Sequence, residues 1–294
     1  MANLRDLRLR MRAIRQTLQV TKAMDLISTA KLRKGRRILE DTEPFFTRIQ
    51  KSMYDILAGG TMEDSIFLTD TEKEDASRTA VVAISSDKGL AGGYNANIFR
   101  FVNQLCREVK NPVLIPIGAI GYRYFIHSPW LIMENFSFRS RLPDLDEARE
   151  VAEYIISQYL WGMFSEVHIV YTHMYSSIKL LPRKIQILPL NKKMMQEEFE
   201  RTGGKRHELK FEYLPSEAAV FDTLVPLYIR GIIYGSLVEA YVSEQSARMS
   251  AMDEASKSAE KMLAGLQLSY NRARQAGITQ EMAEIAGGAE ALNS

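Results

Sequence analysis

The chain has 294 residues, 46% of them hydrophobic, and a formal net charge of +2, so it contains enough apolar material for a substantial core. Its one cysteine, Cys106, excludes a fold held together by internal disulfides and is typical of a reducing compartment. The sequence has no run of about 18 consecutive apolar residues and does not begin with the apolar segment of a signal peptide, so we expect no insertion into a membrane.

Charge is distributed unevenly along the chain. Residues 1–40 carry eleven Lys or Arg against three Asp or Glu, a net charge of +8. Residues 214–294 carry six against ten, a net charge of −4. If both ends are helical, this difference favours pairing between them as a coiled coil.

The first segment, residues 1–58, is predicted to be one helix. Its apolar residues follow the alternating three-four spacing of a coiled-coil seam at Leu4, Leu7, Met11, Ile14 and Leu18. Beyond them the strict repeat would place polar residues on the seam, at Thr21, Asp25 and Ser28. We therefore expect the apolar stripe to move to Val20, Met24 and Ile27, with a change in the geometry of the partner helix.

A basic stripe lies beside this seam, at Arg5, Arg8, Arg12 and Arg15. Such a stripe suits a nucleic acid, an anionic membrane surface or an acidic protein, and a simple solvated face is about equally plausible. Nucleic-acid binders that use a basic helix also carry a groove-reading motif or interleaved aromatic residues, and residues 1–40 contain no aromatic residue. We expect no nucleic-acid partner.

The middle segment, residues 79–190, is predicted to be an α/β domain. Short β-branched runs at 79–85, 113–117 and 166–172 alternate with helical stretches around 95–110, 119–127 and 144–162, a pattern typical of parallel strands in a Rossmann-like layer. Residues 184–190 supply a further strand. Residues 70–78 are predicted to be a surface loop and residues 191–213 an exposed linker.

The last segment, residues 214–294, is predicted to be a second long helix with apolar positions that include Met249, Met252, Met262 and Leu266. A helix from about residue 216 to about residue 286 would be roughly 105 Å long, so at least one end must project from the domain. The predicted fold is an α/β fold in which a long antiparallel coiled coil of the N- and C-terminal helices carries an inserted Rossmann-like domain.

A glycine-containing loop follows the first predicted strand, where α/β proteins often bind phosphates. The spacing of Gly89, Gly92 and Gly93 matches neither dinucleotide-binding nor P-loop motifs, so a nucleotide-binding enzyme is disfavoured. We expect a tight turn with Asp87 and Lys88 facing solvent.

Catalytic and metal-binding motifs are also missing from the sequence. The four histidines lack metal-ligand spacing, and no nucleophile elbow occurs. The acidic group of Asp144, Asp146 and Glu147 resembles the start of a helix more than a catalytic carboxylate pair. We therefore expect no catalytic residue, metal or cofactor in this chain.

Both ends of the chain and the glycine loop carry a family resemblance. Residues 10–34, centred on the sequence Thr21-Lys22-Ala23-Met24, closely resemble the opening helix of the F-type ATP synthase γ subunit family. Residues 243–253, 270–281 and 284–289 resemble the same family's C-terminal signature, and residues 85–98 resemble its loop after the first strand. The matches occur in the family's order and span nearly the whole chain.

The resemblance implies the central rotor shaft, a non-catalytic subunit that couples a membrane ring driven by protons or sodium ions to ATP synthesis or hydrolysis. Its implied partners are the α and β subunits of the α3β3 ring, the epsilon subunit and the membrane c-ring. Carried over residue by residue, the resemblance implies that the side chains facing the β subunits are Met24, Lys88, Arg248, Arg274, Gln275, Thr279 and Glu281.

Three departures from the family pattern qualify this expectation. Lys88 stands where an Arg is usual, so bidentate carboxylate pairing is lost. Ala91 replaces a frequent Cys, and Leu214 occupies a position where a Glu often precedes the Pro of a predicted ring contact. The Cys-bounded insert of chloroplast members is absent and Cys106 is alone, which together with the absence of a transit peptide suggests a bacterial protein peripheral to the cytoplasmic face of the plasma membrane.

The nearest rival is an archaeal or vacuolar-type central-stalk subunit. Those subunits resemble helical hairpins without an inserted α/β domain, so strands at 79–85 and 166–172 discriminate between the two families.

Overall fold

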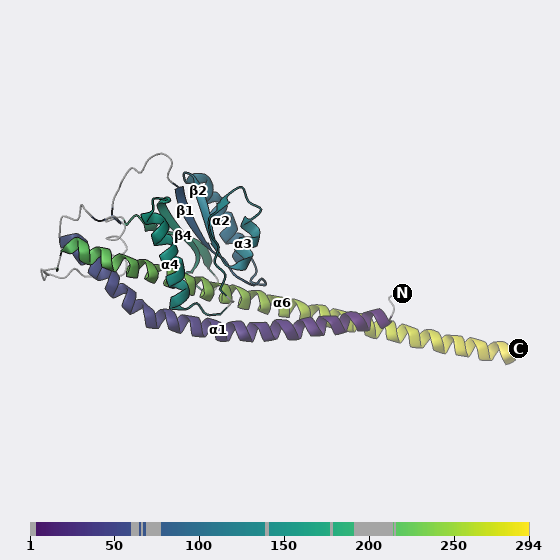
Figure 1. Cartoon of the computed structure of the whole chain (residues 1–294). Coiled ribbons are helices and arrows are strands. Elements are labelled where there is room, and N and C mark those ends of the chain that lie inside the picture. Colours follow the sequence, from purple (N-terminus) through teal and green to yellow (C-terminus); the bar gives the residue numbers. More distant parts are fainter. Residues whose placement is uncertain are drawn as a thin grey trace. The chain divides into compact units, whose positions relative to one another are not determined.

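A computed structural model describes residues 4–59, 65, 67–68, 78–138, 141–176, 179–190, 214 and 216–293. The chain divides into two compact units (Figure 1). The α/β unit is Thr29–Ala247, and the coiled-coil unit combines Met1–Ser28 with Arg248–Ser294. The predicted linker at 191–213 and almost all of the predicted loop at 70–78 lie outside the described residues, so both stay predictions, as does the division into domains.

Two long helices contribute to both units. Helix α1 is Leu4–Gly59 and helix α6 is Glu217–Asn293, and each continues through a proline, Pro44 and Pro226 respectively. Among the described residues, α6 alone is long and apolar enough, by length and composition, to cross a membrane. The side chains of Phe221, Val225, Ile229 and Ile233 on α6 are nevertheless fully buried in the α/β unit.

The α/β unit contains a five-stranded sheet of order β3-β2-β1-β4-β5. The strands are β1 (Arg78–Ile84), β2 (Pro112–Ile117), β3 (Leu131–Ile132), β4 (Phe164–Met174) and β5 (Leu180–Leu188). The first four are parallel, and β5 runs antiparallel to β4. The predicted α/β fold with parallel strands is confirmed, and the rival helical hairpin is excluded.

Helices α2 (Tyr94–Glu108), α3 (Ala119–Phe125) and α4 (Leu145–Leu160) pack on the sheet. Helices α2 and α3 pack on one face, where Ile98, Val102 and Phe125 meet Val81 and Leu114 of the central strands. Helix α4 lies on the opposite face, as the reversed β3-to-β4 connection requires (Figure 1). Because both faces are covered, the central strands are apolar along almost their whole length.

Within the α/β unit, α1 and α6 approach each other closely at two glycines. A Cβ atom added to Gly35 would lie 2.6 Å from Cγ2 of the buried Val242. A Cβ atom added to Gly231 would overlap the ring of Phe46. Glycine is therefore needed at both positions to let the helices pack side by side.

In the coiled-coil unit the two helices run antiparallel. Arg8 Nη2 donates a 2.6 Å hydrogen bond to Tyr270 Oη, and the Ser256 hydroxyl donates a 2.7 Å hydrogen bond to the Thr21 hydroxyl. Lys22 Nζ lies 2.6 Å from Glu260 Oε1, so this basic segment of α1 does meet an acidic residue of α6.

The seam of α1 keeps its strict repeat, and the predicted drift of the apolar stripe is wrong. Thr21 is 7% exposed and Ser28 is buried, whereas Val20 is 57% exposed and Ile27 faces solvent. The polar seam is tolerated because the Thr21 hydroxyl accepts a hydrogen bond from Ser256 and donates one to the Leu18 carbonyl oxygen.

On α6, Met262 is likewise exposed and does not lie on the seam. The burial pattern of both helices in this unit therefore follows the heptad and not the most hydrophobic residues.

Candidate partner-contact surfaces

The glycine loop after β1 is held closed by a pair of polar side chains. The Ser86 amide donates to Asn95 Oδ1 at 3.1 Å, and Asn95 Nδ2 donates to Ser86 Oγ at 2.7 Å. The Ser86 hydroxyl also lies 2.9 Å from the Lys88 carbonyl oxygen, to which it can donate. Lys88 itself is exposed, as predicted.

Asp87 is half-buried and hydrogen-bonded within the chain, so it does not point freely into solvent as predicted. Its Oδ1 atom accepts a 2.8 Å hydrogen bond from the Ala119 amide at the start of α3 and one of 3.2 Å from the Ser137 hydroxyl. Asp87 thus places a carboxylate at the start of α3, and its negative charge repels anions there. The neighbouring Ser85 hydroxyl is also used internally, donating to the Ile117 carbonyl oxygen and accepting from the Gly121 amide.

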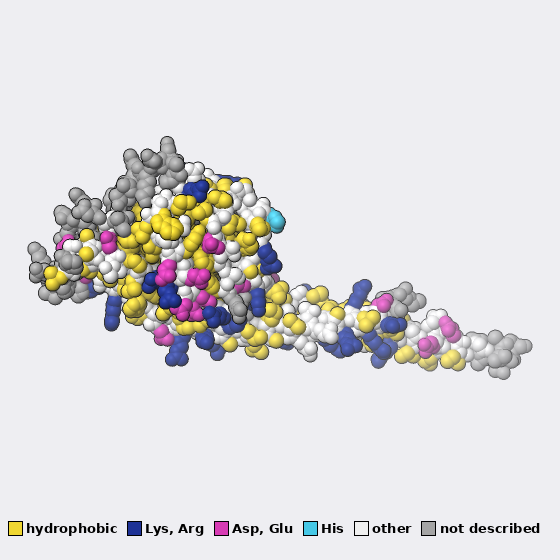
Figure 2. Space-filling model, viewed as in Figure 1, with side chains coloured by type: hydrophobic (Ala, Val, Ile, Leu, Met, Phe, Trp, Pro, Cys, Tyr) yellow, Lys and Arg dark blue, Asp and Glu magenta, His cyan; other side chains and the backbone are white. Residues whose placement is uncertain are grey.

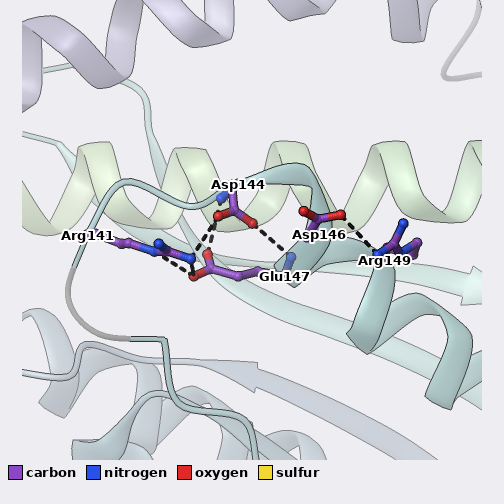
Figure 3. A network of polar contacts seen from close by, with 5 residues as sticks. All are labelled: Arg141, Asp144, Asp146, Glu147 and Arg149. Carbon is purple, nitrogen blue, oxygen red and sulfur yellow. Dashed lines mark hydrogen bonds and ion pairs between the residues drawn. The ribbon is translucent and has the colours of Figure 1, made fainter.

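The acidic group before α4 is the start of a helix (Figure 3). Asp144 Oδ1 accepts from the Glu147 amide at 3.0 Å, and Glu147 Oε2 accepts from the Asp144 amide at 3.1 Å, which makes a reciprocal capping box. Arg141 bridges both carboxylates, at 2.8 Å and 3.1 Å, and Arg149 pairs with Asp146 at 3.0 Å. These carboxylates are committed to helix initiation, as the sequence indicated.

Cys106 and His168, both buried in the core of the α/β unit, have displaced pKa values. Burial raises the pKa of the Cys106 thiol to about 12. Burial also lowers the pKa of His168, helped by the charge of Lys184 and opposed by Glu166. Among the described residues, no group of three or more His, Cys, Asp or Glu side chains could hold a metal ion.

The C-terminal end of α6 is the most open part of the coiled-coil unit. Since Arg8 pairs with Tyr270, the antiparallel register places Leu4, the first residue of α1, level with Arg274. Beyond that level α6 continues to Asn293 without a described residue of α1 beside it, over roughly 28 Å at about 1.5 Å per residue (Figure 1).

Four of the seven predicted contact residues gather on this end of α6. Arg274, Gln275, Thr279 and Glu281 are all exposed. The Thr279 hydroxyl donates a 3.0 Å hydrogen bond to the Gln275 carbonyl oxygen of its own helix. The Arg274 guanidinium and the Gln275 amide therefore offer more N–H donors to a partner at this end than the Thr279 hydroxyl does.

The other three predicted residues are placed differently. Met24 is half-buried on α1, and Arg248 is only 7% exposed at the start of the coiled-coil part of α6. Lys88 belongs to the α/β unit. Less of Met24 and Arg248 is open to a partner than of the four residues near the C-terminal end.

The sequence interpretation overlooked an apolar stripe among these polar residues. Ile278, Met282 and Ile285 lie at four- and three-residue spacing, and each is at least half exposed. Figure 2 shows apolar side chains along one side of this end of α6. The spacing is visible in the sequence. Only the register of α1 against α6 shows that no described residue of α1 covers the stripe.

Comparison with known proteins places the chain in a family. Residues 3–292 match the family model described as ATP synthase. The chain is 41% identical to the ATP synthase gamma chain of Acetivibrio thermocellus over 99% of this chain and 100% of that protein. It is 34% identical to the sodium ion specific ATP synthase gamma chain of Acetobacterium woodii, over 99% of each chain.

Solved structures share the fold. A chain of the Euglena gracilis mitochondrial ATP synthase (OSCP/F1/c-ring) matches with a TM-score of 0.65 at 16% identity, covering 98% of this chain and 94% of that one. A chain of the Tetrahymena thermophila central stalk and c-ring matches with a TM-score of 0.58 at 22% identity, covering 81% and 99%. The family model over residues 3–292 and the 41% identity over nearly the full length show that the chain belongs to the ATP synthase gamma chain family.

Proposed function

We propose that this chain is the rotor shaft of a bacterial F-type ATP synthase and that it couples the passage of protons or sodium ions to ATP synthesis or hydrolysis without catalytic residues of its own. The observation that carries the proposal is the C-terminal end of α6. It presents directional donors and an apolar stripe to its surroundings, and no described residue of α1 covers it.

A rotor shaft that has no catalytic residues can act only through contacts that differ from one side of the shaft to another. A partner shifts between two conformations only if its binding free energy differs between them. The end of α6 has different chemistry on different sides, with Arg274 and Gln275 among its polar groups and Ile278 and Met282 in its apolar stripe. As the helix turns, each surrounding subunit meets these sides in succession.

The directional contacts come from the polar residues. A guanidinium and an amide each make strong hydrogen bonds only at defined angles, and charge-assisted bonds to a carboxylate are the strongest of these. Arg274 and Gln275 suit contacts that form in one orientation of the shaft and break in the next. The apolar stripe suits low-friction contact, because dispersion and hydrophobic burial are not directional.

The proposed partners are the β subunits at the seven residues named above, the α subunits around the shaft, the epsilon subunit and the membrane c-ring. Titles of the similar structures name F1, the c-ring and the central stalk, which supports this set. The proposed location is the cytoplasmic face of the bacterial plasma membrane, with attachment through the complex. The bacterial gamma chains at 41% identity support this placement.

The test replaces both donors near the C-terminal end. In a complex reconstituted with its α, β, epsilon and membrane subunits, the Arg274→Ala/Gln275→Ala variant should assemble, because both side chains are exposed. Coupled turnover should fall, since each lost charge-assisted hydrogen bond is worth about 1.5–3 kcal/mol. ATP hydrolysis and ion pumping are measured together on the same vesicles.

A matched control is available on the same helix. Gln267→Ala/Arg272→Ala removes the same two side-chain types from exposed positions that the family resemblance does not assign to β contacts. The control should keep the parent's rates. Equal rates for the parent and the Arg274→Ala/Gln275→Ala complex would show that these residues are passive surface.

A second measurement addresses the absence of catalysis. The isolated chain should show neither ATPase activity nor saturable ATP binding in calorimetry, because the glycine loop lacks phosphate-binding spacing and Asp87 places a carboxylate at the start of α3. Saturable binding to the purified chain alone would contradict the proposal.

A further inference from the structure

Leu90, in the glycine loop, has a backbone conformation that leucine normally avoids. Its φ is +65°, in the left-handed region. The other described residues with positive φ are glycines, Gly92, Gly118 and Gly162, and an asparagine, Asn111, which tolerates this region. Leucine does not, because its Cβ atom crowds the backbone.

Packing against the described residues does little to offset this strain. The side chain of Leu90 is 62% exposed, whereas the next residue, Ala91, is buried. A glycine at position 90 would remove both the strain and the exposed apolar surface. A strained and exposed leucine in a loop that is proposed to face a partner points to a contact outside the chain.

The loop holds Leu90 in a fixed position. Ser86 and Asn95 close the loop through two hydrogen bonds, the Ser86 hydroxyl reaches the Lys88 carbonyl oxygen, and Ala91 is anchored in the interior. Leu90 and the exposed Lys88 are therefore presented on a rigid turn. A preordered loop loses little conformational entropy when a partner binds it.

We propose that Leu90 is the apolar anchor of this loop's contact with a β subunit, at a surface that places an apolar pocket beside a carboxylate. The inference rests on the proposed function, in which Lys88 faces the β subunits. Lys88 supplies the charge that matches the carboxylate, and Leu90 supplies the buried apolar surface. Together they specify a partner surface that a cation alone would not.

The test separates strain from contact by using three substitutions in the reconstituted complex. Leu90→Gly removes strain and side chain, Leu90→Ala removes the side chain and keeps a Cβ atom, and Leu90→Met keeps an apolar side chain of similar size. Thermal unfolding of the isolated full chain should show that Leu90→Gly is at least as stable as the parent. A clear loss of stability would mean that Leu90 has a structural role, which would overturn the inference.

Binding to the α3β3 ring should respond differently from stability. Leu90→Gly and Leu90→Ala should weaken binding of the chain to the α3β3 ring by about tenfold, as expected for losing one buried leucine side chain. Leu90→Met should remain within about twofold of the parent. If Leu90→Ala binds like the parent, the side chain makes no contact and the inference is wrong, whatever Leu90→Gly does.

The partner is identified by cross-linking from a Leu90→Cys variant. The native Cys106 is buried, so a thiol-directed photo-cross-linker attaches selectively at position 90. Capture of β supports the inference, and capture of α or epsilon alone, or of no subunit, overturns it. If the parent complex couples normally while the Leu90 variants match it, only this inference fails. If the parent chain supports no coupling, the proposed function fails and this inference fails with it.

Discussion

The α/β unit and the coiled-coil unit bury their side chains in different ways. In the α/β unit, residues such as Leu114 and Ile155 are fully enclosed from both sides of the sheet and its helices. In the coiled-coil unit, only a narrow seam is buried, and it includes the hydroxyl residues Thr21 and Ser28. The α/β unit is stabilised by an enclosed core, and the coiled-coil unit leaves most of its surface exposed.

Polar groups show the same contrast. The α/β unit uses Asp87 and Glu147 internally, to start helices α3 and α4. The coiled-coil unit leaves Arg274 and Gln275 exposed on α6. Polar residues near the end of a strand therefore do not by themselves indicate a ligand site. Exposed hydrogen-bond donors on a helix that no described residue covers are better candidates for partner contact.

The largest expected effect comes from cavities in the α/β core. Leu114→Ala should lower the free energy of unfolding by about 3–4 kcal/mol, because Leu114 is fully enclosed. Leu7→Ala in the coiled-coil seam should cost about 1–2 kcal/mol, because the neighbouring side chains can relax toward solvent. Urea unfolding of the full chain measures both. Equal losses would contradict the contrast between the two units.

The next effect tests the close approach of α1 and α6 within the α/β unit. Gly231→Ala should destabilise the chain by about 1–3 kcal/mol, because the new Cβ atom displaces the Phe46 ring. Gly235→Ala, one turn later, has open space around its Cβ position and should instead stabilise α6 by up to about 1 kcal/mol. Thermal unfolding should give a midpoint below the parent's for Gly231→Ala and above it for Gly235→Ala. Midpoints that shift in the same direction would contradict the close packing of Gly231 against Phe46.

A smaller effect concerns the polar seam of the coiled-coil unit. Thr21→Val should cost about 1 kcal/mol, because it leaves the buried Ser256 hydroxyl without its acceptor. Thr21→Val combined with Ser256→Ala should recover most of that loss, since no unpaired hydroxyl remains. Hydrogen exchange of the α1 amides in this unit reports the change. A double variant as unstable as the sum of the singles would mean that the hydroxyls do not interact.

The smallest effect is a pH dependence from the α/β core. Because the pKa of His168 is lowered in the folded chain, mainly by burial, the unfolded chain takes up this proton first. The free energy of unfolding should therefore fall as the pH drops through the ordinary histidine value of about 6.5, and should not change from this source above it.

His168→Gln should reduce this slope, whereas His127→Gln, at an exposed position, should leave it nearly unchanged. Chemical unfolding at a series of pH values measures both variants. An unaltered slope in His168→Gln would show that the lowered pKa is not linked to folding.

Much of the fold follows from local patterns. The β-branched runs at 79–85 and 166–172 mark β1 and β4 to within a few residues. Strand β3 was not predicted, because two residues, Leu131 and Ile132, are too short to form a pattern and exist only through pairing with β2. Helix α4 was correctly predicted from its acidic start.

Local sequence patterns predict burial less reliably where contacts between distant residues determine it. Val20 and Ile27 look like seam residues by hydrophobicity, but the heptad and the Ser256 hydroxyl place Thr21 there instead. Asp87 looks solvent-facing until the start of α3 is brought against it. The exposure of Ile278 and Met282 depends on where α1 begins relative to α6, which no local pattern contains.

If this chain couples ion flow to ATP synthesis or hydrolysis by turning, its rotation can be observed directly. A probe is attached to an Ile126→Cys variant, because Ile126 is exposed while burial raises the pKa of the native Cys106 thiol to about 12. The complex is immobilised through its α and β subunits and supplied with ATP. We expect continuous rotation of the probe in one direction, and slower rotation in the Arg274→Ala/Gln275→Ala variant. ATP hydrolysis by the assembled complex while the probe stays still would contradict it.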